Sequence, residues 1–171
     1  MKRRRLEGKT DYLARIALLK SGKPRIVFRK TNKYIIGQYL VSVEAQDKVL
    51  IGVSSKELLE YGWPENSAGS LKSLPACYLT GLLLGKKIKD YIKGVVNKKN
   101  FSSYGEVEAI FDIGLIRNLP KSRAYAFLNG VIDAGIKVPH KKEIFPDEKR
   151  LKGNHLKNKN VNFEKIKSSL K

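Results

Sequence analysis

Few residues of this 171-residue chain are arranged for hydrolytic chemistry. Gly8-Lys9-Thr10 has the wording that ends a phosphate-binding loop, but the motif needs another glycine five residues before Gly8, where Arg3 stands. No predicted strand precedes the segment either. The sequence therefore argues against a nucleotide hydrolase.

Histidine, cysteine and carboxylate chemistry is equally sparse. The chain has two histidines, His140 and His155, and one cysteine, Cys77, with no metal-ligand spacing among them. Asp112 and Asp133 could serve a metal-dependent nuclease, but such an enzyme usually brings several carboxylates to its metal. We expect no catalytic residue, no metal and no cofactor, and the nuclease is the least favoured alternative.

Cationic side chains are abundant and unevenly distributed. The chain carries 35 Lys and Arg against 16 Asp and Glu, a formal net charge of +19. Residues 1–33 hold a net charge of +10, residues 34–136 hold +2, and residues 137–171 hold +7. This partition predicts a nearly neutral body between two cationic extensions that bind a polyanion. Because neither extension shows a strong amphipathic stripe, nucleic acid is favoured over a membrane surface.

Two segments combine cations with hydrogen-bonding and stacking groups, the mixture that RNA recognition uses. Lysine and arginine bind phosphates, asparagine and threonine bond sugar or base edges, and tyrosine stacks on bases. A helix N-terminus beside cations also favours a phosphate. The first segment is a predicted hairpin with Arg25, Arg29, Lys30, Thr31, Asn32, Lys33 and Tyr34. The second is the predicted start of the last helix of the body, with Arg117, Lys121 and Arg123. Ordinary strand and surface roles are the alternative for Arg29, Tyr34 and Arg123.

Hydrophobic periodicity predicts the elements that position these side chains. Strands are predicted over residues 25–30, 34–41, 49–53 and 107–113, with turns at 31–33 and 46–48. Helices are predicted over residues 11–20, 54–59, 75–92 and 122–134, with a polar loop at 65–73. The order of the body is β-β-β-α-β-α, and its crossover helix lets the fourth strand join the sheet in parallel. The fold class is therefore α/β with a mixed sheet and basic N- and C-terminal extensions.

Several helix details carry their own expectations. Ser122 should cap the last helix of the body, and Gly135 should end it. Gly81 and Gly85 cost a helix about 1 kcal/mol each relative to Ala, so we expect close packing on a sheet or another backbone.

Composition also predicts the domain boundaries. Residues 1–22 form a basic arm with a short helix, residues 23–138 a globular α/β domain, and residues 139–171 a basic extension. The extension is proline- and lysine-rich, so we expect it to be irregular and ordered mainly by its partner. A single cysteine permits no intramolecular disulfide, and no apolar run reaches the roughly 20 residues of a membrane span. We expect a cytoplasmic protein with no membrane partner and no small-molecule substrate.

Several motifs, in their order along the chain, resemble one known family. They include Gly8-Lys9-Thr10-Asp11-Tyr12, the hairpin from Lys23 to Lys33, Pro75-Ala76-Cys77-Tyr78, Leu128-Asn129-Gly130-Val131 and Arg150-Leu151-Lys152-Gly153. Together, over about residues 3–156, they are similar to the archaeal form of the 5S rRNA-binding protein of the large ribosomal subunit, the universal large-subunit protein eighteen family.

The resemblance implies a domain of the ribonuclease-H-like translational component type without catalytic activity. It implies binding to 5S rRNA in the central protuberance, with large-subunit rRNA and the neighbouring 5S-binding ribosomal protein as further partners. The RNA-binding residues expected in the arm are Arg3, Arg4, Arg5, Lys9, Thr10, Tyr12 and Arg15. The hairpin and Arg123 would also face RNA, and the tail would be anchored by Lys152 and His155. A general basic RNA- or DNA-binding module outside the ribosome is the main alternative.

Overall fold

The computed structural model describes residues 3–96, 108–153 and 163–170. Two short helices come first, α1 (Arg3–Leu6) and α2 (Tyr12–Lys20), followed by strands β1 (Arg25–Lys30), β2 (Ile35–Val43) and β3 (Gln46–Ser54). After two 3₁₀ segments, η1 (Ser55–Leu59) and η2 (Glu65–Ser70), come α3 (Leu74–Val96), β4 (Ile110–Asp112) and α4 (Arg123–Asp133). The chain continues through η3 (Lys142–Ile144), α5 (Glu148–Leu151) and α6 (Phe163–Leu170).

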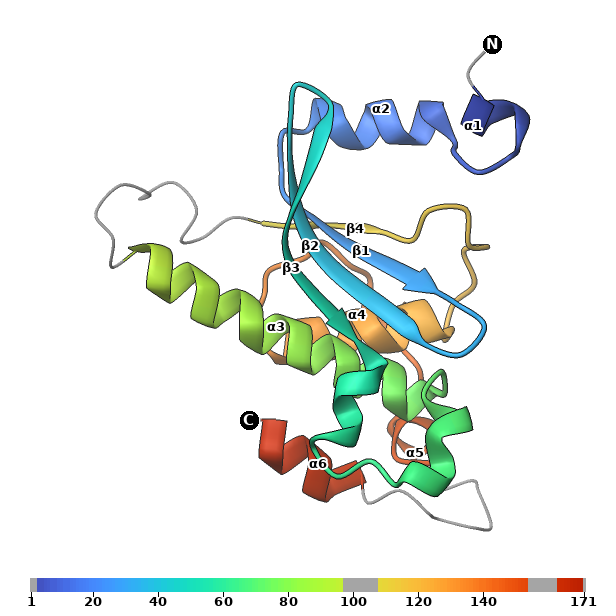
Figure 1. Cartoon of the computed structure of the whole chain (residues 1–171), viewed down its shortest axis with the longest axis vertical. Coiled ribbons are helices and arrows are strands. Elements are labelled where there is room, and N and C mark those ends of the chain that lie inside the picture. Colours follow the sequence, from blue (N-terminus) through green and yellow to red (C-terminus); the bar gives the residue numbers. More distant parts are fainter. Residues whose placement is uncertain (1–2, 97–107, 154–162, 171) are drawn as a thin grey trace.

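The sheet is mixed, as the sequence predicts, with strand order β3-β2-β1-β4. β1 runs antiparallel to β2, with Lys30 opposite Ile35, and parallel to β4, with Val27 opposite Asp112. Figure 1 shows α3 and α4 together against one face of the sheet and α2 beside the far end of the β2–β3 hairpin. The crossover through α3 therefore places β4 at the edge of the sheet, beside β1.

The β2–β3 hairpin is longer than predicted, and its turn lies elsewhere. The expected turn at residues 46–48 is wrong because these residues pair within β3, where Lys48 lies opposite Val41. The chain reverses at Glu44 and Ala45, whose φ angles are +50° and +64°. A two-residue hairpin turn of type I′ requires this left-handed backbone at both positions, although glycine, asparagine and aspartate usually supply it. Because Glu44 and Ala45 stand where glycine or asparagine usually does, the sequence does not indicate a turn at these positions.

Side-chain caps start α2 and η1 but not α4. Asp11 accepts hydrogen bonds from the backbone N–H groups of Leu13 and Ala14, which starts α2. Ser54 and Glu57 form a capping box at the start of the helix predicted over residues 54–59, although it opens a 3₁₀ helix rather than an α-helix. Ser122 occupies the N-cap position of α4, but its side chain makes no capping hydrogen bond, which corrects the prediction.

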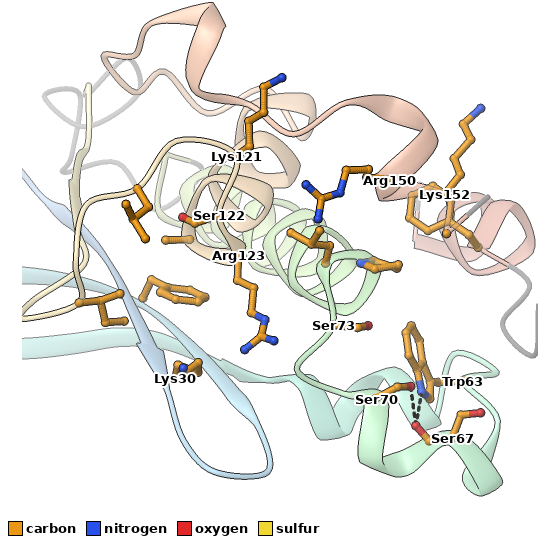
Figure 2. A pocket seen from close by; sticks show the side chains of 18 of the residues that line it. Lys30, Trp63, Ser67, Ser70, Ser73, Lys121, Ser122, Arg123, Arg150 and Lys152 are labelled. Carbon is orange, nitrogen blue, oxygen red and sulfur yellow. Dashed lines mark hydrogen bonds between the residues drawn. The ribbon is translucent and has the colours of Figure 1, made fainter. Parts of the chain in front are cut away.

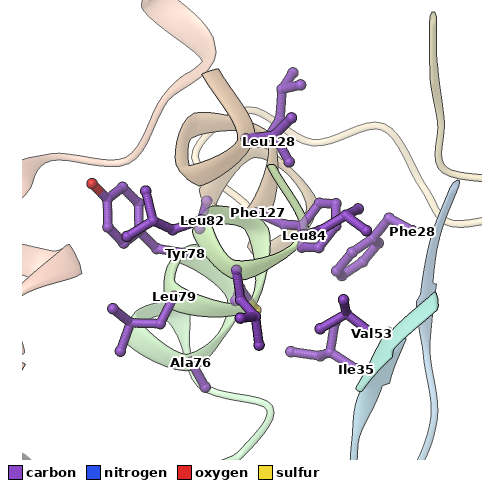
Figure 3. Close-up of a cluster of buried hydrophobic side chains, with 14 of the residues drawn as sticks. Phe28, Ile35, Val53, Ala76, Tyr78, Leu79, Leu82, Leu84, Phe127 and Leu128 are labelled. Atoms are coloured by element: carbon purple, nitrogen blue, oxygen red, sulfur yellow. The ribbon is translucent and has the colours of Figure 1, made fainter. Parts of the chain in front are cut away.

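The core forms between the sheet and the tightly crossed pair α3 and α4. A Cβ atom added at Gly130 would lie 2.0 Å from the carbonyl oxygen of Tyr78, and one added at Gly81 would lie 2.1 Å from that of Phe127. The predicted close approach to another backbone is thus confirmed for Gly81, whereas the nearest atom to an added Cβ at Gly85 is the Ala134 Cβ at 2.4 Å. Figure 3 shows Phe28 of β1 meeting Phe127 of α4, with their ring centroids 5.3 Å apart.

The C-terminal extension is part of this core, contrary to the expectation of an irregular tail. Leu151, Phe163, Ile166 and Leu170 are each at most 6% exposed and belong to the same buried cluster as α3. The apolar residues of α6 recur at positions 163, 166 and 170, a helical stripe that the surrounding lysines disguise in the average composition.

The N-terminal helices contrast with this packing. Neither α1 nor α2 contains a buried residue, and Leu13 of α2 is 83% exposed. Among the helices that the structure describes, none combines the length and apolar character needed to cross a membrane.

Candidate nucleic-acid interface

A ladder of alternating charges crosses the sheet face that points away from α3 and α4. Arg25 lies on this face because its neighbour Ile26 points into the core. The Arg25 guanidinium contacts two carboxylates, Asp112 at 3.2 Å and Asp47 at 2.6 Å. Asp47 also pairs with Arg15 of α2 at 2.9 Å. The ladder thus joins the N-terminal arm to the β2–β3 hairpin and the sheet.

These contacts show how much of three predicted RNA-binding arginines is free to contact RNA. The side chain of Arg25 is 3% exposed and satisfied inside the protein, which argues against a direct RNA contact. Arg15 is 31% exposed and also donates to the Ala45 carbonyl. Arg29 is 43% exposed, and its guanidinium approaches Asp112 at 3.4 Å. Arg15 and Arg29 keep exposed surface, so their RNA contacts stay predictions.

The ladder also shows what the two aspartates of the nuclease alternative do. Asp112 is 8% exposed, accepts from Arg25 and Arg29, and accepts the backbone N–H of Gly114 at 2.7 Å. Asp133 accepts the Tyr78 hydroxyl at 2.5 Å, on the helical side of the molecule. Within residues 3–96, 108–153 and 163–170, no three His, Cys, Asp or Glu side chains are placed to hold a metal.

Two titrating groups report on these environments. Burial raises the pKa of Asp47, but hydrogen bonds from Ser42 and Arg15 and the charge of Arg25 outweigh it, so the net pKa is below the ordinary aspartate value. Burial raises the pKa of the Cys77 thiol far above its usual range. Cys77 is 0% exposed, so it is a core residue rather than a nucleophile.

The tip of the β1–β2 hairpin presents cations on a fixed turn. The Thr31 hydroxyl donates to the Tyr34 carbonyl at 2.8 Å and accepts from the Tyr34 N–H at 2.9 Å, which locks the turn. Lys72 donates to the Asn32 carbonyl at 3.0 Å, and Lys56 lies 4.4 Å from the centre of the Tyr34 ring. Lys33 is exposed. The turn therefore holds a basic tip whose hydroxyl and ring are already engaged.

The arm is exposed and partly self-paired. Arg4 donates to the Thr10 hydroxyl at 2.9 Å, and Glu7 pairs with Lys9 at 2.9 Å and with Arg3 at 3.6 Å. The other predicted RNA-binding residues of this segment are Arg5, which is exposed, and Tyr12, which is half-buried. One glutamate thus offsets part of the charge of a strongly cationic segment.

A second concentration of cations surrounds a cleft of about 880 Å³ between β1, α3, α4 and α5. Six basic and no acidic residues line it. They are Lys30, Arg117, Lys121, Arg123, Arg150 and Lys152. In Figure 2 the Arg123 side chain extends from the start of α4 toward Lys30, whereas the amino groups of Lys121 and Lys152 point away from the hollow.

The fold therefore gathers residues that are more than a hundred positions apart in sequence. Five of the cleft cations were predicted as RNA-binding, and Arg150 was missed. Arg150 lies two residues before Lys152 in the same basic motif, so its position was a usable signal. His155 lies outside the described residues, and its role stays a prediction.

The fold and these surfaces define a small α/β protein with exposed cations on an arm, a hairpin tip and a cleft, a distribution typical of proteins that bind polyanions. A family model described as ribosomal large subunit proteins 60S L5 and 50S L18 matches residues 1–141. The chain is 49% identical over 154 residues to large ribosomal subunit protein uL18 of Korarchaeum cryptofilum, which covers 90% of this chain and 70% of that protein. It is 47% identical over 154 residues to uL18 of Methanoculleus marisnigri, covering 90% of this chain and 78% of that protein.

The chain therefore belongs to the family of ribosomal large subunit proteins 60S L5 and 50S L18. This confirms the family predicted from the motifs. The chain is a structural, non-enzymatic protein of the large ribosomal subunit, and the predicted cytoplasmic, ribosomal location is confirmed with it. The nuclease alternative is excluded on the same ground.

Proposed function

We propose that the chain binds 5S rRNA and helps to attach it to large-subunit rRNA in the central protuberance, beside the neighbouring 5S-binding ribosomal protein. We also assign the domain to the ribonuclease-H-like translational component type. Family membership supports a ribosomal partner, and the distribution of exposed cations supports a folded RNA.

The observation that carries this proposal is the contrast between buried and exposed cations. The buried Arg25 is neutralised by Asp47 and Asp112. By contrast, the described side chains of Lys30, Lys33, Arg117 and Arg123 are exposed and form no ion pair within residues 3–96, 108–153 and 163–170. Exposed, unneutralised cations at several points of a rigid body fit an extended polyanion with a fixed shape.

Competition binding tests the proposal against the general nucleic-acid-binding alternative. Labelled 5S rRNA is bound to the full chain and competed with unlabelled 5S rRNA, an unrelated structured RNA of equal length, and duplex DNA of equal charge. We expect 5S rRNA to compete at least about tenfold better, because shape and loops rather than charge alone set the preference. Equal competition by all three would overturn the 5S assignment and favour the alternative.

A further inference from the structure

We propose that the cleft between β1, α3, α4 and α5 holds one unstacked RNA nucleotide, with its phosphate on the arginines and its base against the apolar wall. The inference rests on the proposed function and goes beyond it, because it assigns a defined pocket to a single nucleotide. We call this region the nucleotide cleft. It is lined by the six cations named above and by the apolar residues Leu74, Pro75, Ile116 and Leu119.

Charge is the first argument. Lys121 and Lys152 form ion pairs with residues that do not line the cleft, Asp147 at 3.2 Å and Glu164 at 3.0 Å. Lys30, Arg117, Arg123 and Arg150 have no ion pair within the described parts of the chain. Four unneutralised like charges around one hollow repel each other, and a bound anion would relieve that repulsion.

The start of α4 is the second argument. Ser122, Arg123 and Ala124 line the nucleotide cleft, and the Ser122 side chain makes no capping hydrogen bond. The first-turn N–H groups of this 11-residue helix therefore have no side-chain acceptor from the N-cap. A phosphate beside Arg123 would supply acceptors where the helix end favours negative charge.

The apolar wall is the third argument, and it separates a nucleotide from a bare phosphate. Leu74, Pro75, Ile116 and Leu119 line the cleft, and Leu119 is 47% exposed. A cleft of about 880 Å³ lies within the range of about 300–1,000 Å³ typical of ligand pockets. Proteins that recognise single-stranded RNA stack splayed bases on aromatic rings or arginine guanidinium planes, and flipped bases are also held by apolar side chains, whereas paired bases in a duplex offer no free face.

The single tryptophan supplies a native probe, because Trp63 also lines the nucleotide cleft. Its indole N–H donates to the Ser67 carbonyl at 3.2 Å, as Figure 2 shows, so the ring is held in place. The experiment titrates the full chain with a six-nucleotide single-stranded RNA, the same strand with abasic sugars, and the same strand in a duplex. An acidic peptide that contains phenylalanine is the fourth probe.

We expect the single strand to shift Trp63 emission and to bind about tenfold more tightly than the abasic strand, since only the single strand carries a base that can contact the apolar wall. The duplex and the peptide should leave the emission unchanged. The double variant Arg123→Gln/Arg150→Gln should weaken binding of the single strand about tenfold. The matched control Lys89→Gln/Lys93→Gln removes two exposed charges from α3 and should weaken it less than about twofold.

Equal binding of the abasic strand, an emission shift caused only by the peptide, or equal loss in both double variants would each overturn the proposal. The charge-retaining pair Arg123→Lys/Arg150→Lys guards against misfolding, and it should restore most of the affinity. If 5S rRNA wins its competition while Trp63 stays silent, the nucleotide cleft is refuted and the proposed function stands. If the single strand shifts Trp63 but 5S rRNA has no advantage, the proposed function fails instead.

Discussion

At the scale of single residues, exposure separates arginines with the same chemistry into two roles. Arg25 is 3% exposed and holds Asp47 and Asp112, so it organises the sheet. Arg123 is exposed at the mouth of the nucleotide cleft. Removing one carboxylate from Arg25 would leave a buried charge with fewer partners, a change that typically costs several kcal/mol. Stability and the proposed RNA binding thus depend on different arginines.

Asp47 should give the fold a defined weakness in acid. Its pKa is lower in the folded chain than in the unfolded chain, so its contribution is fully present above the unfolded value near pH 4. The contribution is lost as the pH falls through the lower folded value. Denaturant unfolding should therefore show wild type more stable than Asp47→Asn at pH 7, with the difference shrinking below about pH 4. A difference that is constant from pH 7 to pH 3 would contradict this assignment.

At the scale of elements, the crossing of α3 and α4 depends on glycines that place two backbones in direct contact. Gly81 faces the backbone of Phe127, and Gly130 faces the backbone of Tyr78. The crossing carries Phe127 to the sheet, where its ring meets Phe28. It also positions the N-terminus of α4 at the nucleotide cleft, so a packing device in the core sets the geometry of a surface site.

Gly130→Ala should destabilise the protein by about 2 kcal/mol or more. The added Cβ would lie 2.0 Å from the Tyr78 carbonyl oxygen, so the helices must separate, and this outweighs a helix-propensity gain of about 1 kcal/mol. Gly94→Ala in α3 is the matched control, because its Cβ would meet nothing within 4 Å. Urea unfolding should show the control unchanged or slightly more stable. Similar values for the two variants would refute the close crossing.

At the scale of the whole molecule, folding and charge are divided between different parts of the chain. The core includes residues of the sheet, α3, α4, α5 and α6, whereas α1 and α2 contribute no buried residue. The N-terminal arm is tied to the body by the Arg15–Asp47 pair rather than by burial. We therefore expect the arm to serve binding and the C-terminal helices to serve stability.

Replacing Arg3, Arg4 and Arg5 with alanine should weaken 5S rRNA binding and leave thermal unfolding nearly unchanged. Each lost phosphate contact lowers the slope of log affinity against log salt by about 0.7–0.9, so three contacts should lower it by about 2–3. Removing the same number of charges from α3, as Lys86, Lys89 and Lys93 to alanine, is the control. Binding measured from 50 to 200 mM salt should show a smaller change there. A large fall in the unfolding temperature of the arm variant would show instead that the arm belongs to the core.

The sequence alone determined what depends on local chemistry and on order along the chain. The β-branched run of residues 25–30 formed β1 with the predicted bounds, Asp11 started α2, and Gly81 signalled a close helix approach. The motif order also identified the family, and the charge partition marked the polyanion-binding class. Each of these signals is carried by neighbouring residues or by their order along the chain, so no tertiary contact is needed to interpret it.

Only the tertiary structure decided which cations are available and which apolar residues are core. Arg25 is removed from the surface by Asp47 and Asp112, which are 22 and 87 positions away in sequence. Phe163, Ile166 and Leu170 join the core because α3 lies beside them, although polar and charged residues make up most of their segment. The nucleotide cleft exists because the fold brings β1, α3, α4 and α5, which are far apart in the sequence, around one hollow. Exposure and neutralisation are set by contacts between distant segments, and composition averages over the residues that make them.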